Sequence, residues 1–203
     1  MIILQFFLFF LSLFVVSVSI AGFGSFFSTK PKSNFFLEIF LGFIIISLII
    51  TIIHFFFKIN LLIALLVFSF GLFIFFTKKK LSFLKKLKIE YLYYLIIILL
   101  FIPIFISQKY HEDFGYYHLP YALSFIEEKI IFGFANIDKP YVYNSIWLNL
   151  YSIFFLSEKN FNFLTLPSFL LFLSFILFSS NQLLSKNDKT TSDYFLLVTL
   201  FYF

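Results

Sequence analysis

Long apolar stretches separated by short polar linkers make up the first half of the chain. A helix needs about 20 predominantly apolar residues to cross about 30 Å of hydrocarbon. Four stretches approach or exceed this length, and each is predicted to be a transmembrane helix: 1–22, 35–57, 61–77 and 90–107. A signal peptide is the alternative for the first stretch, but no Lys precedes it and it exceeds a hydrophobic region of about 7–15 residues.

The second half of the chain continues this pattern after a polar interruption at 108–160. A fifth transmembrane helix is predicted at 161–180, and a sixth begins at 194 and reaches only residue 203. The apolar stretch 146–156 is too short to span and predicts a helix that lies at the surface or dips partway in. The whole pattern predicts an all-α, polytopic transmembrane bundle, and the short sixth helix suggests the amino-terminal part of a longer protein.

Composition supports the membrane class and removes several kinds of site. Hydrophobic residues make up 62% of the chain and charged residues 12%, with a mean hydropathy of +1.02, whereas soluble domains carry about 25% charged residues. The absence of cysteine excludes disulfides, thiolate metal sites and a cysteine nucleophile. All fifteen basic residues are lysine, and the net charge is +5.

The lysines predict the orientation of the bundle. Six of them lie in one short loop between apolar stretches: Lys78, Lys79, Lys80, Lys85, Lys86 and Lys88. Such loops face the cytoplasm under the positive-inside rule, which also explains the positive charge without nucleic-acid binding. Alternation then places the turn 58–60 and the segment 108–160 outside a bacterial plasma membrane.

Two residues within the predicted helices have features of their own. A histidine inside a membrane helix suggests a functional role, but His54 is near the end of its helix, where it is expected to reach the interface. Gly71 is expected to permit close contact between helices.

The external segment holds most of the side chains capable of chemistry. Residues 108–145 contain two of the three histidines and five of the ten carboxylates. A short helix is predicted at 119–132, with Pro120 in its first turn and Gly133 just past its end. Its two faces differ, as in a helix that rests on a membrane or on other helices: Ser124, Glu127 and Glu128 on one, and Ala122, Phe125, Ile126 and Ile130 on the other.

Glu112 and Asp113 are the candidate catalytic residues of this segment. Adjacent side chains point in different directions, so the two carboxylates are not expected to act on one substrate atom. A carboxylate at the mouth of a bundle can act as a general base or a metal ligand. Zn or Mn bound by His111, Asp113 and His118 is a second interpretation, although their spacing matches no recognised metal site. The other interpretation is that these are solvated loop residues.

Three short strings in the segment carry a resemblance to known proteins. They are Glu112-Asp113-Phe114-Gly115-Tyr116-Tyr117-His118-Leu119-Pro120, Phe132-Gly133-Phe134-Ala135-Asn136-Ile137 and Tyr143-Asn144-Ser145-Ile146-Trp147. In this order they resemble a group of bacterial multi-pass proteins that is similar to the GT-C glycosyltransferases, such as protein mannosyltransferases. In those enzymes an acidic residue of the first large external loop acts as base or helps to hold a metal, and the donor is a sugar on a polyprenyl phosphate.

The resemblance implies a site and a reaction for this chain. Asp113 matches the external-loop acid, with Glu112 as its partner, and a divalent metal is an open question. The implied substrate-binding positions, without assigned roles, are Tyr117, His118, Asn136, Asn144 and Trp147, with Lys139 in place of an expected arginine. The chain also departs from typical GT-C enzymes because several helices, and not one, precede the acidic loop. The alternative is a non-catalytic membrane protein, such as a transporter or flippase component or a structural partner.

Overall fold

The computed structural model describes residues 2–27, 34–79, 95–100, 114–133, 136, 146–155, 166–185 and 190–202. Over these residues the regular structure is entirely helical, which confirms the all-α prediction for this part of the chain. Residues 95–100, inside the predicted helix 90–107, are also helical. The named helices are α1 (Ile2–Gly24), α2 (Phe35–Phe56), α3 (Leu61–Lys79), η2 (Phe114–His118), α5 (Leu119–Glu127), α6 (Ile146–Ile153), α7 (Leu166–Ser185) and α8 (Thr191–Tyr202).

Three of these helices are long and apolar enough to cross a membrane: Phe35–Phe56, Leu61–Lys78 and Leu166–Leu183. In α1, the stretch Phe10–Gly24 is a shorter apolar helix. The start of α2 is fixed by Asn34, whose side-chain oxygen accepts a hydrogen bond from the Phe36 amide, as helix N-caps do.

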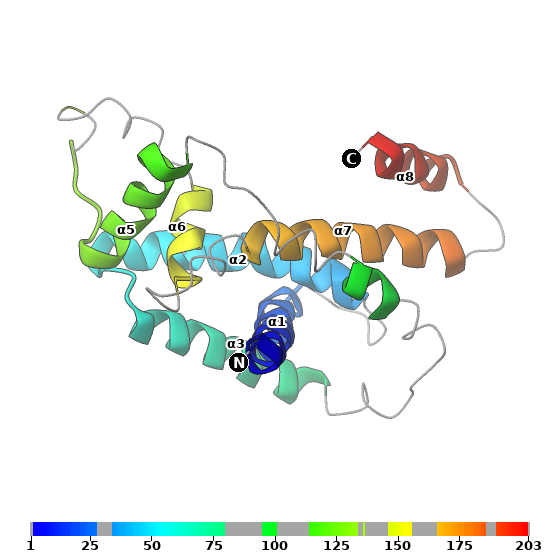
Figure 1. Cartoon of the computed structure of the whole chain (residues 1–203), viewed down its shortest axis with the longest axis horizontal. Coiled ribbons are helices and arrows are strands. Elements are labelled where there is room, and N and C mark those ends of the chain that lie inside the picture. Colours follow the sequence, from blue (N-terminus) through cyan, green and yellow to red (C-terminus); the bar gives the residue numbers. More distant parts are fainter. Residues whose placement is uncertain are drawn as a thin grey trace.

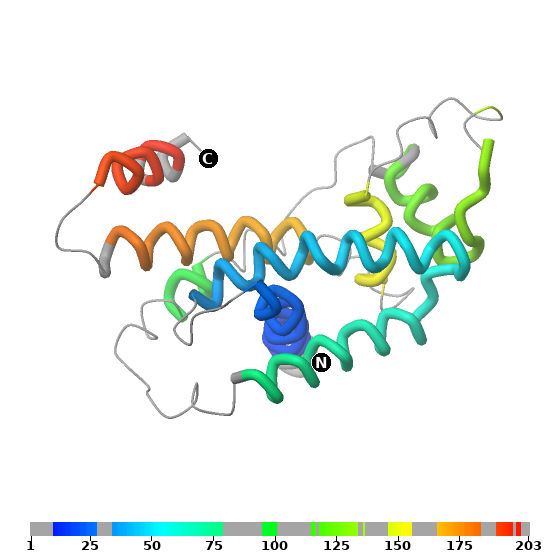
Figure 2. Tube along the Cα trace, turned by 180° about the vertical axis from the view of Figure 1, so that it is seen from behind, coloured from blue at the N-terminus to red at the C-terminus, as the bar shows by residue number. Residues whose placement is uncertain are grey.

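The long helices are arranged around α2 (Figure 1). α2 and α3 diverge from the turn at 57–60, and α1 lies between them, seen nearly end-on. α7 runs beside α2 in the opposite direction, and α8 lies beyond α7, as the view from behind also shows (Figure 2). α5 and α6 gather at the carboxyl end of α2. The core therefore forms where α1, α6 and α7 meet α2 and where α1 and α6 meet α3.

Glycines allow α1 to pack directly on its two neighbours. A Cβ atom on Gly22 would collide with the Gly71 carbonyl of α3, and one on Gly42 of α2 would collide with the Ile20 carbonyl of α1. The Ser19 hydroxyl, beside Gly71, donates a hydrogen bond to the Phe68 carbonyl at 2.7 Å. Small residues let helix backbones approach closely where lipid offers no hydrophobic drive between helices. The close contact predicted at Gly71 is therefore confirmed.

Replacing Gly71 by Ala is expected to lower the free energy of unfolding by about 1–3 kcal/mol, the range for overpacking a tight interior site. The new methyl group would meet the side chain and backbone oxygens of Ser19. Gly115→Ala is the matched control, because a Cβ atom there meets nothing within 4 Å. Thermal unfolding in detergent would compare the two variants, and equal melting temperatures would contradict the packing.

Contacts between helix ends group the loops into two sets. At one end, the Lys78 ammonium donates a hydrogen bond to the Ser25 carbonyl at 3.1 Å and lies 4.4 Å from the centroid of the Phe26 ring. The end of α1 therefore meets the end of α3. At the other end, the Ile59 amide donates to the Phe125 carbonyl at 2.8 Å. The turn 58–60 and α5 thus lie at one end of the bundle, as alternation of sides requires.

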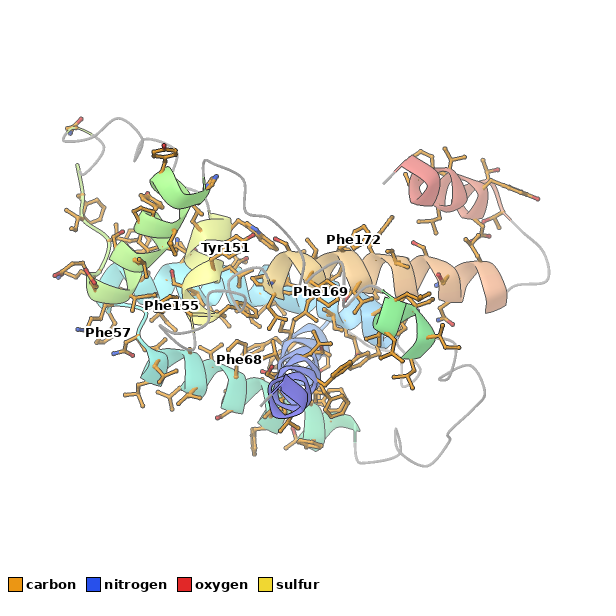
Figure 3. The ribbon with its side chains drawn as sticks, in the orientation of Figure 1. Phe57, Phe68, Tyr151, Phe155, Phe169 and Phe172 are labelled. Carbon is orange, nitrogen blue, oxygen red and sulfur yellow. The ribbon has the colours of Figure 1, made fainter. Side chains whose placement is uncertain are left out.

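The short helix α6 is buried more deeply than a surface helix. Leu150, Ile153 and Phe154 have no exposed surface, and the Phe154 ring packs on Phe68 of α3 at 5.5 Å and Phe43 of α2 at 6.5 Å. Apolar side chains on one face of α6 therefore fill the space between α2 and α3. In Figure 3, Phe68 on α3 lies in this region.

The helices α5 and α8 differ from their predicted bounds, each for a local reason. α5 ends at Glu127 and not at 132, because Glu128 adopts an extended backbone conformation. Gly133 has a positive φ of 83°, but it serves a separate turn in which the Asn136 amide donates to the Gly133 carbonyl. α8 begins at Thr191, because the Thr190 amide and hydroxyl both donate to the Asp193 carboxylate, a form of capping box.

Candidate functional site

His54 forms the centre of the contacts at the carboxyl end of α2. Its side chain has no exposed surface. One ring nitrogen, Nδ1, lies 2.9 Å from Asn149 Oδ1 of α6, and the other, Nε2, lies 3.1 Å from the Glu128 carbonyl. The edge of the imidazole faces the Phe125 ring of α5 at a centroid distance of 4.3 Å. One side chain thus joins α2 to α6, to α5 and to the residues after α5.

Two backbone hydrogen bonds reinforce this junction. The Ile130 amide donates a hydrogen bond to the His54 carbonyl at 3.1 Å, and the Ile59 amide donates to the Phe125 carbonyl. Residues 128–133, called the strap below, are therefore tied to α2 by both the side chain and the backbone of His54. In Figure 3, Phe57 marks the turn beside this junction.

Asn149 and Thr51 extend the polar contacts into the bundle. The Asn149 amide group lies 3.5 Å from Thr51 Oγ1, and the Thr51 hydroxyl donates to the Ser47 carbonyl at 2.8 Å. Asn149 is 2% exposed. A neutral imidazole has one donor and one acceptor nitrogen. The Glu128 carbonyl and Asn149 Oδ1 both accept hydrogen bonds, so a neutral His54 ring donates to one of them, and its tautomer decides which.

His54 was expected near the end of its helix, where its side chain can reach the interface. The helix does end two residues after His54, but α5 and the strap cover the ring. Asn149 was not singled out in the sequence. Its signal is a lone amide in an apolar stretch, which must find a hydrogen-bonding partner when buried. Thr51 and His54, three residues apart, share the helix face that supplies it.

Glu112 and Asp113, called the acidic motif below, come immediately before the described residues 114–133. Glu112, Asp113 and His111 fall outside the described residues, as do Lys139 and Asn144. The helical stretch η2–α5 begins at Phe114, the residue that follows Asp113. Asp113 is therefore joined covalently to a helix whose far end is fixed on α2.

The other candidate residues have three different environments. Tyr117 lies in η2, and His118 follows it with an exposed side chain at the start of α5. Asn136 is exposed and belongs to the turn at Gly133. Trp147 is half-buried on α6, with its ring 6.0 Å from Phe43 and edge-on to Tyr151. Packing in the bundle therefore accounts for Trp147, whereas the side chains of His118 and Asn136 are exposed.

Within the described residues, no group of three or more His, Cys, Asp or Glu side chains is arranged to hold a metal ion. The metal interpretation involved His111, Asp113 and His118, of which the structure describes only His118. That interpretation remains a prediction.

Three helices have the length and apolar character of membrane spans, and residues 128–130 are bonded to the end of one of them, α2, which suggests a helical membrane protein. The chain belongs to the family described as Domain of unknown function (DUF8201), whose profile matches residues 1–203. Comparisons with curated proteins and with solved structures gave no match.

Proposed function

We propose that this protein is a membrane-bound glycosyltransferase of the GT-C type. It transfers a sugar from a polyprenyl-phosphate donor to a hydroxyl group of a cell-envelope acceptor, on the outer side of the bacterial plasma membrane. The proposal combines the resemblance of the three strings with one structural observation. The helix that begins directly after Asp113 is fixed on the outer end of α2 through His54 and Phe125.

This observation supports the proposal because catalysis needs a base held in a defined place. Fixing a reacting group removes much of the entropic cost of bringing it to a substrate. A loop carboxylate without a support has many positions, whereas the residue after Asp113 begins the helical stretch η2–α5, whose Phe125 ring contacts His54 of α2. The lipid part of a polyprenyl-phosphate donor would lie beside those spans, with its phosphate at their ends.

In the proposed step, the Asp113 carboxylate accepts the proton of the acceptor hydroxyl. The acceptor oxygen then forms a bond to the anomeric carbon of the sugar, and the bond from that carbon to the phosphate oxygen breaks. The lipid phosphate leaves with the electron pair of the broken bond. Glu112 is the partner of Asp113 in positioning. The exposed His118 and Asn136 are candidates for contacts with the sugar or phosphate.

Deletion of the gene in its natural host tests the class of reaction. Mass spectrometry of released envelope glycans and glycolipids is expected to show the loss of one sugar unit and an accumulation of its lipid-linked donor. Expression of the full-length protein is expected to restore the unit. An unchanged glycan and glycolipid profile in the deletion strain would contradict the proposal and would favour the non-catalytic alternative.

A further inference from the structure

The strap and the end of α2 together expose an apolar surface. It consists of Phe55, Phe56 and Phe57 from α2 and its turn, and of Ile131 and Phe132 from the strap, called the rim patch below. Phe132 is 81% exposed and Phe56 is 69% exposed. The Phe132 and Phe55 rings lie 6.0 Å apart, so the two parts of the patch touch.

The position of the rim patch is set by hydrogen bonds and not by the patch itself. The Ile130 amide and the Glu128 carbonyl are both bonded to His54. These hydrogen bonds are made by strap backbone groups on the side that faces His54. The side chains of the next two residues, Ile131 and Phe132, are exposed. The segment is thus held with its large apolar side chains away from the protein core.

The rim patch continues an exposed apolar row along α2, a helix long enough to span a membrane. The exposed positions of α2 follow a helical spacing along one side: Ile44, Leu48, Ile52 and Phe55, with exposed fractions of 56%, 52%, 61% and 44%. Residues three and four apart share a helix face, and α2 is one of the helices long enough to span. Phe132 contacts the last member of this row, so it extends the row at its outer end.

The residues that flank the rim patch match the border of a bilayer. Lys58 follows Phe57, and Lys129 lies in the strap, both with exposed side chains. Glu127 and Glu128, at the end of α5, are exposed as well. Large apolar side chains such as Phe at the boundary between headgroups and lipid chains, with lysines that reach past them to water, are typical of segments that lie in a membrane interface.

We propose that the strap inserts into the outer interfacial layer of the bilayer, with Phe132 and Ile131 among the lipid chains beside Phe55–Phe57. The partner of the rim patch is lipid, because the patch is continuous with the lipid-facing side of α2. The outer segment is then attached at two places, to α2 through His54 and to the bilayer through the strap. This inference does not depend on a catalytic role for Asp113.

The absence of cysteine in the chain permits a direct test with single spin labels. The full-length protein would be reconstituted in phosphatidylcholine–phosphatidylglycerol vesicles after Phe132→Cys substitution and labelling. Leu48→Cys is the lipid-facing reference and Glu127→Cys the water-facing one, each at an exposed site where folding is least disturbed. Electron paramagnetic resonance would measure the collision of each label with oxygen, which enriches in lipid, and with a polar nickel chelate.

The label at position 132 is expected to favour oxygen over the chelate, as at position 48 and opposite to position 127, with a shallower depth than at position 48. A label at position 132 that matches position 127 would overturn the proposal. A label at position 132 shielded from both reagents would also overturn it, because a second protein surface and not lipid would then cover the patch.

Discussion

Replacing Asp113 by Asn in the full-length protein is expected to remove the transferred sugar from the envelope, while the protein reaches the membrane in its normal amount. Asn has nearly the shape of Asp but cannot accept the proton of the acceptor hydroxyl. Loss of a general base lowers a rate by about 10²–10⁴-fold. Complementation of the deletion strain, followed by mass spectrometry of the glycans and quantification of the protein in membranes, measures both quantities.

Glu127→Gln is the matched control for this substitution. Glu127 is an exposed carboxylate at the end of α5, so the substitution removes the same charge from the same outer segment without touching the acidic motif. It is expected to leave the glycans unchanged. Glu112→Gln, in turn, shows whether the neighbouring carboxylate shares the role. Normal glycans in the Asp113→Asn strain would exclude Asp113 as the base, even if deletion of the gene abolished the sugar unit.

The second large effect is expected from His54→Leu. The substitution leaves the Glu128 carbonyl and the Asn149 side chain without their imidazole partner in a buried place. A buried polar group that loses its partner costs about 1–3 kcal/mol, so the free energy of unfolding should fall by about 3 kcal/mol. Chemical denaturation in detergent measures this change, and limited proteolysis should show earlier cleavage within the strap.

Two further variants separate the His54 contacts from a general effect of losing histidine. His118→Leu removes an exposed imidazole and is expected to change stability little. In a double-mutant cycle, His54→Leu and Asn149→Leu should be non-additive by about 0.5–3 kcal/mol, as for residues in contact. Equal stabilities of the His54→Leu and His118→Leu proteins would contradict the role given to His54.

The long helices could be predicted from the sequence because an apolar stretch of spanning length permits few other structures. In a membrane every backbone polar group needs an internal partner, which a helix supplies locally. α2 was expected at 35–57 and occurs at Phe35–Phe56, and α3 was expected at 61–77 and occurs at Leu61–Lys79. The close packing at Gly71 follows from the same reasoning, because a small residue in such a helix admits a neighbour.

The end of α5 and the burial of α6 were harder to predict, because contacts between residues far apart in the sequence determine them. The end of α5 at Glu127 depends on the strap pairing with His54, 74 residues away from Glu128 along the chain. The burial of α6 depends on the space left between α2 and α3. Neither the end of α5 nor the burial of α6 can be predicted from the helical periodicity of a single segment. His54 and Asn149 each had a local signal, but only the fold brings them together.

The segment after the acidic motif is docked on α2 at His54. Hydrogen–deuterium exchange of the Ile130 and Ile59 amides in the full-length wild-type protein tests this docking most directly. These amides donate to the His54 and Phe125 carbonyls, so both are predicted to exchange far more slowly than the same sequence in an unstructured peptide. Exchange of both amides at the unstructured rate would contradict the docking.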